Sequence, residues 1–193
     1  MQDFISLRFC TFFFAFHFDI ISKNLLILID SGAFMKKISV EEFWKNYLKS
    51  SGKDPSTGYT SELSFGDDDE SSSLNILEIL SGKRTAFSSS YYAFEIDREP
   101  LPKKGNLYVL TDWLDNPYAV LETKDVTTLP FNMIPWSLAQ KENEAESLDE
   151  WKEVKAEFFE YDADVMGYNF SPEMPVVFEE FVVIYRNPEA CGL

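Results

Sequence analysis

The stretch that decides the fold is Leu80-Ser81-Gly82-Lys83-Arg84-Thr85-Ala86-Phe87-Ser88-Ser89. A helical pattern ends at its glycine, two cations follow at once, and a hydroxyl-rich segment then enters a predicted strand. Cations and hydroxyls at such a junction can form a small polar site for an anion or a polar ring. The rest of the chain is acidic, so this positive cluster is the first candidate for a functional site.

The composition of the 193-residue chain narrows the classes of partner. Its formal net charge is -16 and its sequence pI is near 4.4. Extended duplex nucleic acid is disfavoured, because counterion release needs many Lys and Arg contacts to phosphates. The acidity can serve solubility alone, and it leaves room for a basic pocket that takes one nucleotide or a short single strand. The length predicts a single domain.

Metal, cofactor and histidine chemistry find no support in the sequence. Cys10 and Cys191 lie near opposite ends without metal-type spacing, and His17 is the single histidine. We therefore expect no zinc site and no catalytic histidine. There is no phosphate-binding glycine loop and no serine elbow, so no cofactor is expected. The cysteine usage is typical of a cytoplasmic protein.

Residues 1–34 differ from the rest of the chain, because they hold eight of its eighteen phenylalanines. A signal peptide would need a small-x-small cleavage site, which is missing. A membrane span would need about 20 apolar residues, and Asp19 and Lys23 interrupt the run. We expect translation to start at Met35, so that 1–34 is not part of the natural protein and 35–193 is the domain. A membrane or signal role and a packed extension remain the alternatives.

Capping residues and apolar spacing predict three main helices and a short one near 135–141. The first follows the capping box Ser39–Glu42 and ends near Gly52. The second follows an acidic, serine-rich loop at 66–73 and ends at the glycine of the opening stretch. The third starts at the capping box Ser147–Glu150. The residues expected to face the core from the second and third helices are Leu74, Leu77, Leu80, Trp151, Val154 and Phe158.

β-branched and aromatic runs predict four strands. They cover residues 86–96, 107–111, 118–126 and 176–185. Strands in succession with helices at the edges predict an α+β barrel rather than a doubly wound sheet.

A series of short motifs covers most of residues 40–185. In chain order they are Phe43-Trp44, Leu63-Ser64-Phe65-Gly66, Leu80 to Ala86, Pro100 to Gly105, Asn116-Pro117, Leu121-Glu122-Thr123, Pro130-Phe131-Asn132, Ala139 to Glu144, Ser147-Leu148-x-x-Trp151 and Phe181-x-x-x-Tyr185. In order and spacing they resemble the ASCH domain family, in particular a bacterial branch with an extra N-terminal helix. The resemblance implies a PUA-like β-barrel with flanking helices. It links the chain to RNA binding, to cleavage of single-stranded RNA, and to amide hydrolysis of an acylated cytidine nucleoside.

In the small amidohydrolase branch, the resemblance implies three working residues: a lysine, a threonine three positions later, and a glutamate. These positions fall on Arg84, Phe87 and Glu142, so only the glutamate matches. Lys83 is one place too early. A guanidinium stays protonated and cannot serve as a base, and a phenyl ring has no hydroxyl. The amidase mechanism is therefore hard to run with these residues.

The substituted pocket fits binding better than catalysis. The candidate ligand-binding residues are Lys83, Arg84, Thr85, Phe87 and Ser89. The expected ligand is a nucleoside, a nucleotide or a short single-stranded RNA. The alternative is a small hydrolase, a ribonuclease or an acylated-cytidine amidohydrolase, with Glu142 as catalytic acid or base. A module for a non-nucleic partner is a third possibility.

A purely structural interpretation stays open for the same residues. Arg84 and Glu142 can form an ion pair at the barrel mouth, with Phe87 in the core. If Phe87 instead faces the pocket, Ser89 shares its face and Ser88 does not. The nearby acids Glu144 and Glu146 read as a solvated loop. Trp151 is expected in the core, and Trp136 is a weaker candidate for lining the cleft.

Overall fold

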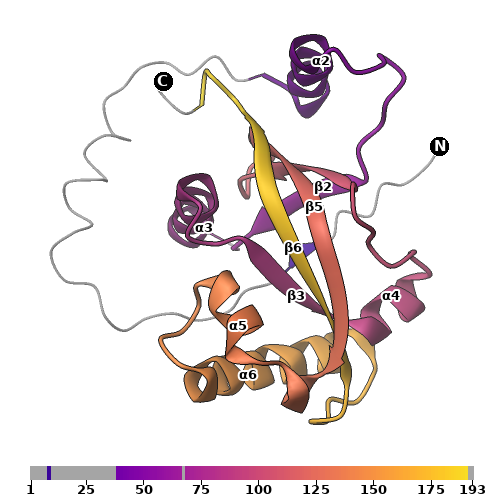
Figure 1. The fold of residues 1–193 in the computed structure, drawn as a ribbon, viewed down its shortest axis with the longest axis vertical. Coiled ribbons are helices and arrows are strands. Elements are labelled where there is room, and N and C mark those ends of the chain that lie inside the picture. Colours follow the sequence, from indigo (N-terminus) through magenta and orange to yellow (C-terminus); the bar gives the residue numbers. More distant parts are fainter. Residues whose placement is uncertain (1–7, 10–37, 67, 191–193) are drawn as a thin grey trace, which may run out of the picture.

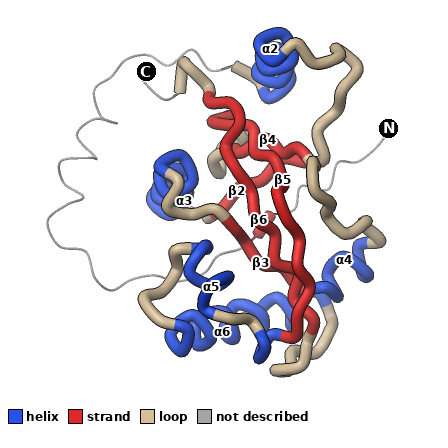
Figure 2. The backbone as a smooth tube through the Cα atoms, viewed as in Figure 1, coloured by secondary structure: helices blue, strands red, loops and turns tan. Residues whose placement is uncertain are grey.

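The computed structural model describes residues 8–9, 38–66 and 68–190 (Figure 1). One six-stranded mixed sheet forms its centre, in the order β1-β2-β4-β5-β6-β3 (Figure 2). β1, β2 and β4 are parallel neighbours, and the other neighbours are antiparallel. The strands are β1 (Arg8–Phe9), β2 (Ser61–Phe65), β3 (Ala86–Ser90), β4 (Leu107–Thr111), β5 (Pro117–Pro130) and β6 (Pro175–Arg186).

The sheet curves strongly enough to bring β2 close to β3. Three strands separate these two in the sheet, yet the ring centroids of Phe65 and Phe87 lie 5.7 Å apart. Bulges in β5 and β6 pairing, at Val120/Leu121 and Thr123/Asp125, increase the local bend. The result is a half-barrel, which confirms the expected α+β class with a barrel-like sheet.

Five α-helices surround the sheet in the described part of the chain. α2 lies at one end of the sheet, α3 lies beside it, and α5 and α6 lie at the opposite end (Figure 1). The helices are α2 (Val40–Ser51), α3 (Asp69–Ser81), α4 (Tyr91–Asp97), α5 (Trp136–Ala139) and α6 (Leu148–Met166), with 3-10 turns η1 (Phe131–Met133) and η2 (Gln140–Glu142). The predicted N-caps Ser39 and Ser147 each accept the amide of the third helical residue, and Gly52 and Gly82 end their helices in left-handed conformations.

Three apolar clusters hold the elements together. The half-barrel cluster lies inside the curved sheet and against α3, and it contains Leu63, Phe65, Ile76, Ile79, Phe87, Tyr108, Leu110, Ala119, Leu121 and Phe181. The α6 cluster joins β3 and β6 to α5 and α6, and it contains Ala86, Phe131, Ile134, Ala139, Trp151, Phe159, Met174, Val176 and Phe178. A third cluster packs α2 against β4 and β5. β3 and β6 thus contribute side chains to clusters on both faces.

Several elements differ in their bounds from the sequence prediction, and one strand was not predicted. The expected strand 86–96 ends at Ser90, whose side chain caps α4 by accepting the amide of Tyr92. α3 begins at Asp69, because the Asp68 carboxylate accepts the Ser71 amide at 2.7 Å and converts the acidic loop into a helix start. β2 was not predicted as a strand.

The buried faces of two helices are also rotated from the prediction. α3 buries Ser72, Ile76 and Ile79, whereas Leu74 is 43% exposed. α6 buries Trp151, Lys155, Phe159 and Ala163. Val154 and Phe158 are only half-buried. Because the buried stripe of α6 includes a lysine, Lys155, the apolar pattern placed the buried positions after Trp151 one residue too early.

The proposed start at Met35 lies outside the described residues, as does most of 1–34. Within that segment, Arg8 and Phe9 are described, and they pair with Ser64 and Phe65 of β2. In the described part of the chain, none of the helices combines the length and the apolar character that crossing a bilayer requires.

Gly66 provides a test of the connection between β2 and α3. It has φ +87°, and a Cβ placed there would lie 2.5 Å from Ser71 Oγ and 2.6 Å from the Ser72 amide nitrogen. We expect Gly66→Ala to lower the free energy of unfolding by roughly 3 kcal/mol, from backbone strain plus the clash.

Urea denaturation of two control variants separates the cost of backbone strain from the cost of the clash. Gly82→Ala meets only strain, because φ is +76° with open space around it, and should cost about 1 kcal/mol. Gly58→Ala has neither feature and should be neutral. Equal stability of the Gly66 and Gly58 variants would contradict the proposed clash.

Candidate functional site

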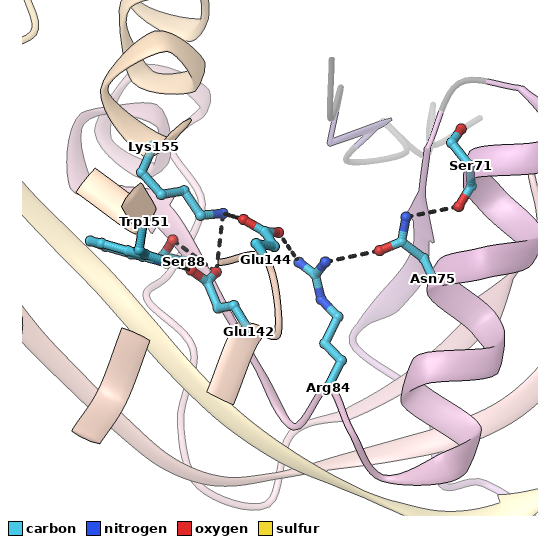
Figure 3. A network of polar contacts seen from close by, with 8 residues as sticks. All are labelled: Ser71, Asn75, Arg84, Ser88, Glu142, Glu144, Trp151 and Lys155. Carbon is cyan, nitrogen blue, oxygen red and sulfur yellow. Dashed lines mark hydrogen bonds and ion pairs between the residues drawn. The ribbon is translucent and has the colours of Figure 1, made fainter. Parts of the chain in front are cut away.

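The opening stretch lies beside the turn that contains Glu142. The Thr85 amide donates to the Lys141 carbonyl at 2.8 Å, and the Thr85 carbonyl accepts the Phe181 amide. The opening stretch and the Ala139–Glu144 motif are therefore in direct contact. Between them runs the charged network, which consists of Arg84, Glu142, Glu144 and Lys155 with the polar partners Asn75, Ser88 and Trp151 (Figure 3).

Glu142 is fully buried at the end of η2. Its Oε1 accepts from the Ser88 hydroxyl at 2.9 Å and lies 3.2 Å from Lys155 Nζ. Its Oε2 accepts from Trp151 Nε1 at 2.6 Å. Three donors from β3 and α6 thus fix the carboxylate in one orientation.

Glu144 joins the two cations of the network. One carboxylate oxygen lies 2.7 Å from Lys155 Nζ, and the other lies 2.8 Å from Arg84 Nη2. Lys155 is 3% exposed and Arg84 is 3% exposed. Two buried cations therefore face two carboxylates, and the formal charge of the four groups sums to zero, as a buried ionic group requires.

Arg84 connects this group to α3. Its Nη1 donates to Asn75 Oδ1 at 2.8 Å, and Asn75 Nδ2 donates to the Ser71 carbonyl at 2.8 Å. The guanidinium also stacks over the Phe65 ring, with Cζ 4.8 Å from the centroid. The network consequently spans from α6 to α3 (Figure 3).

The two carboxylates differ electrostatically. Burial raises the pKa of Glu142, and although Lys155 opposes this shift, the charge of Glu144 adds to it. Burial also acts to raise the pKa of Glu144, but the Lys155 and Arg84 charges together outweigh it and hold that pKa below its usual value. Glu144 therefore keeps its negative charge to lower pH, and Glu142 takes up a proton more readily.

Two buried atoms of the network lack a hydrogen-bond partner among the described residues: Arg84 Nε and Glu144 Oε1. Glu144 Oε1 is close to Arg84 Nη2, so that contact is an ion pair without hydrogen-bond alignment. Nε and Nη2 belong to the same edge of a guanidinium. Arg84 Nε is therefore a buried donor without a hydrogen-bond partner, next to an oxygen that is already held in the Arg84–Glu144 ion pair.

The structure distributes the predicted site residues between different environments. Arg84 and Glu142 both belong to the network, but the ion pair is Arg84–Glu144 rather than Arg84–Glu142. Phe87 packs in the half-barrel cluster against Phe65 and Phe181. Lys83 is exposed.

Two further expectations concern β3 and the acidic loop. Ser88, not Ser89, reaches Glu142, because Phe87 points into the half-barrel and its neighbour points the other way. Ser89 is buried on the Phe87 side. Glu144 is not a solvated residue, whereas Glu146 is exposed as expected. Trp136 is half-buried against the α6 cluster.

Lys155 is the main residue that sequence reasoning missed. It lies one turn after Trp151 on the buried stripe of α6, where a cation is unexpected. A lysine in an apolar stripe next to a loop with two glutamates is the signal that could have revealed it. Asn75 carried no such signal.

Comparisons with known proteins agree with this architecture. The family model of the ASCH domain matches residues 61–185. The crystal structure of protein EF3133 from Enterococcus faecalis V583, assigned to the family model DUF984, is 29% identical, with a TM-score of 0.69 over 76% of this chain and 88% of that chain. The crystal structure of an ASCH domain from Lactobacillus crispatus JV V101 is 30% identical, with a TM-score of 0.68 over 75% and 93% of the two chains. The search of curated proteins gave no match. The matches confirm the expected PUA-like α+β fold.

Lys155→Met tests the charge balance of the network. It leaves Glu142 buried without its nearest cation, and we expect a loss of roughly 3 kcal/mol in the free energy of unfolding at pH 7. The loss should shrink at pH 4, where protonation of the carboxylates removes the uncompensated charge.

The matched control is Lys152→Met on the same helix, whose amine makes only a 3.4 Å contact to the Asn132 carbonyl. Guanidinium denaturation of both variants at the two pH values gives the comparison. Equal losses for the two lysines would contradict a network role for Lys155.

Proposed function

The chain belongs to the ASCH domain family, and on that footing we propose that it binds a nucleoside, a nucleotide or a short single-stranded RNA at the charged network. The observation that carries this proposal is the buried Arg84 Nε, which has no hydrogen-bond partner among the described residues and lies beside the Arg84–Glu144 ion pair. A nucleobase presents acceptors and donors side by side on its Watson–Crick edge. Such an edge can accept from Arg84 and donate to Glu144 at once, and single-stranded nucleic acid leaves that edge free.

The contacts within the network fix the orientation of the Arg84 and Glu144 side chains that would recognise the base. Asn75 and the Phe65 ring fix the plane of the Arg84 guanidinium, and Lys155 fixes Glu144 from the other side. Donors and acceptors that are already ordered lose less conformational entropy when a ligand binds. This pre-organisation favours recognition of one planar polar ring.

Exposed cations near the network suit a phosphate group. Lys83 directly precedes Arg84 and is exposed. Arg186 is exposed at the end of β6, and its Nη2 donates to the Leu80 carbonyl at 2.7 Å. Two cations gathered at the end of α3 in a chain of net charge -16 favour a single phosphate over a long backbone.

Arg84→Lys tests the binding proposal while keeping the positive charge. Lysine has no second donor on a fixed edge, so affinity for the best ligand of a panel should fall by roughly tenfold or more. The panel consists of nucleosides, nucleoside monophosphates and single-stranded RNA of a few nucleotides, measured by isothermal titration calorimetry on the full chain.

Lys53→Arg provides the control, because Lys53 is exposed after α2. It should bind as the unchanged protein does. Unaltered affinity in Arg84→Lys would rule out Arg84 as the base-reading residue.

A hydrolase is the second candidate, favoured by the contacts of Glu142. Its carboxylate receives the Ser88 hydroxyl and the Lys155 amine, and burial raises its pKa, which suits a general acid that protonates a leaving group. Hydrolysis of an amide or a phosphodiester would begin with the ionised form. Glu142 takes a proton from water as the water oxygen attacks the carbonyl carbon or the phosphorus, and it returns that proton to the leaving nitrogen or oxygen as the bond to it breaks.

Glu142→Gln separates catalysis from binding. It keeps the shape of the side chain, so binding should persist, whereas hydrolysis of acetylated cytidine or of short RNA should drop by about 100-fold or more if Glu142 is catalytic. Product formation is followed by chromatography. Turnover that is unchanged in this variant would exclude Glu142 as the acid or base.

A further inference from the structure

A second buried acid lies on the opposite face of β6 from the charged network. Phe178 packs in the α6 cluster with Trp151, whereas Phe181 packs in the half-barrel cluster with Phe87. Glu179 follows Phe178 and contacts Tyr108 of the half-barrel cluster, so its side chain points into the curved sheet. It is 2% exposed there.

Glu179 has hydroxyl partners but no cation. Thr123 Oγ1 of β5 donates to Glu179 Oε1 at 2.7 Å, and the Tyr108 hydroxyl of β4 lies 3.4 Å from Oε2. From β3, the residue in register is the apolar Phe87. Among the described residues, no Lys or Arg lies within ion-pair distance of the Glu179 carboxylate. Glu99 is the other charged residue nearby, and its negative charge helps to raise the pKa of Tyr108.

This environment disfavours the charged form of Glu179. Burial raises its pKa to about 7, and the hydrogen bonds from Thr123 and Tyr108 only partly oppose the shift. Glu142, by contrast, has a lysine beside it. A buried carboxylate without a counterion must draw in water or move toward solvent once it ionises.

The strand most exposed to such a movement is β3. Among the described strands it is the last of the sheet and pairs with β6 alone. Phe87 of β3 pairs with Glu179, and the next residue, Ser88, donates to Glu142 in the charged network. Glu179 is therefore linked, through its β3 neighbour Phe87, to the next residue of that strand, which contacts the network.

We propose that Glu179 holds β3 firmly against β6 only while it is protonated, and we call this role the fastening of β3. In its neutral form it lets β3 and β6 pair closely, and in its ionised form it hydrates the core and loosens β3. Ligand binding at the charged network then weakens as Glu179 ionises, a part of the proposal that rests on the proposed function. The loosening of β3 itself does not depend on any ligand.

The direction with pH follows from proton linkage. Glu179 is neutral in the folded protein at pH values where an ordinary glutamate, with a pKa of 4.5, is already ionised in the unfolded chain. Through this group the folded state binds more protons, so the stability that Glu179 contributes is fully present below pH 4.5 and is lost as pH rises toward about 7. Above that pH this contribution stays constant.

Hydrogen exchange of the ligand-free protein tests the fastening. After correction for intrinsic rates, amides of residues 86–90 should exchange roughly tenfold faster at pH 8 than at pH 5. In Glu179→Gln, which is uncharged at both pH values, this difference should vanish. Its midpoint of thermal unfolding should exceed that of the unchanged protein by roughly 5 °C or more at pH 8, with little difference at pH 5.

Glu173→Gln is the control, because Glu173 is exposed in the turn before β6. It should keep the pH dependence of the unchanged protein. The same pH dependence in Glu179→Gln, or none in the unchanged protein, would overturn the proposal.

Titration of cytidine monophosphate in the same buffers distinguishes a failure of the fastening from a failure of the proposed nucleotide binding. Exchange that responds to Glu179 without nucleotide binding refutes the proposed ligand alone. Binding with pH-independent exchange refutes the fastening alone.

Discussion

Two buried glutamates sharing one buried lysine form the interaction on which the region around β3 depends. Lys155 lies 3.2 Å from one oxygen of Glu142 and 2.7 Å from one of Glu144. The three side chains come from η2, the following loop and α6, and Ser88 adds β3. Since a buried charge is tolerated only with its counterion, none of these elements can move far without exposing or stranding a charge. Glu179, in the same sheet, has hydroxyl partners alone, so no counterion compensates its charge when it ionises.

The fold was predictable wherever local chemistry decides it. N-cap serines and C-terminal glycines marked helix ends correctly at Ser39, Gly52 and Gly82, because capping depends on neighbouring residues only. The buried face of α3 was not predictable in this way, since Leu74 and Ile79 are equally apolar and only the position of the sheet selects between them. The boundary at Ser90 failed for a related reason. A run of Ser, Tyr and Phe fits a strand as well as the short helix that follows the cap.

The candidate site was only half accessible to sequence reasoning. Motif spacing identified Arg84 and Glu142, since both lie in segments that resemble the family pattern. Some partners of these residues are distant in the chain, as Ser88 is from Glu142, and such pairing across more than fifty residues leaves no local signature. The acidic sequence around Glu144 predicts a solvated residue, whereas its two cations come from α6 and from the segment just before β3. Tertiary contacts, rather than residue type, decide which acid of an acidic loop is buried.

The arginine at position 84 is better understood as a structural choice than as a damaged catalytic lysine. Its guanidinium reaches Asn75 with one nitrogen and Glu144 with another while its plane covers Phe65. A lysine ammonium is a point charge without a plane, so it cannot make all three contacts from the same backbone position. The amine that the network needs arrives instead from α6, as Lys155. The charge and the fork are thus supplied by separate residues, and the Nε of Arg84 is left without a hydrogen-bond partner among the described residues.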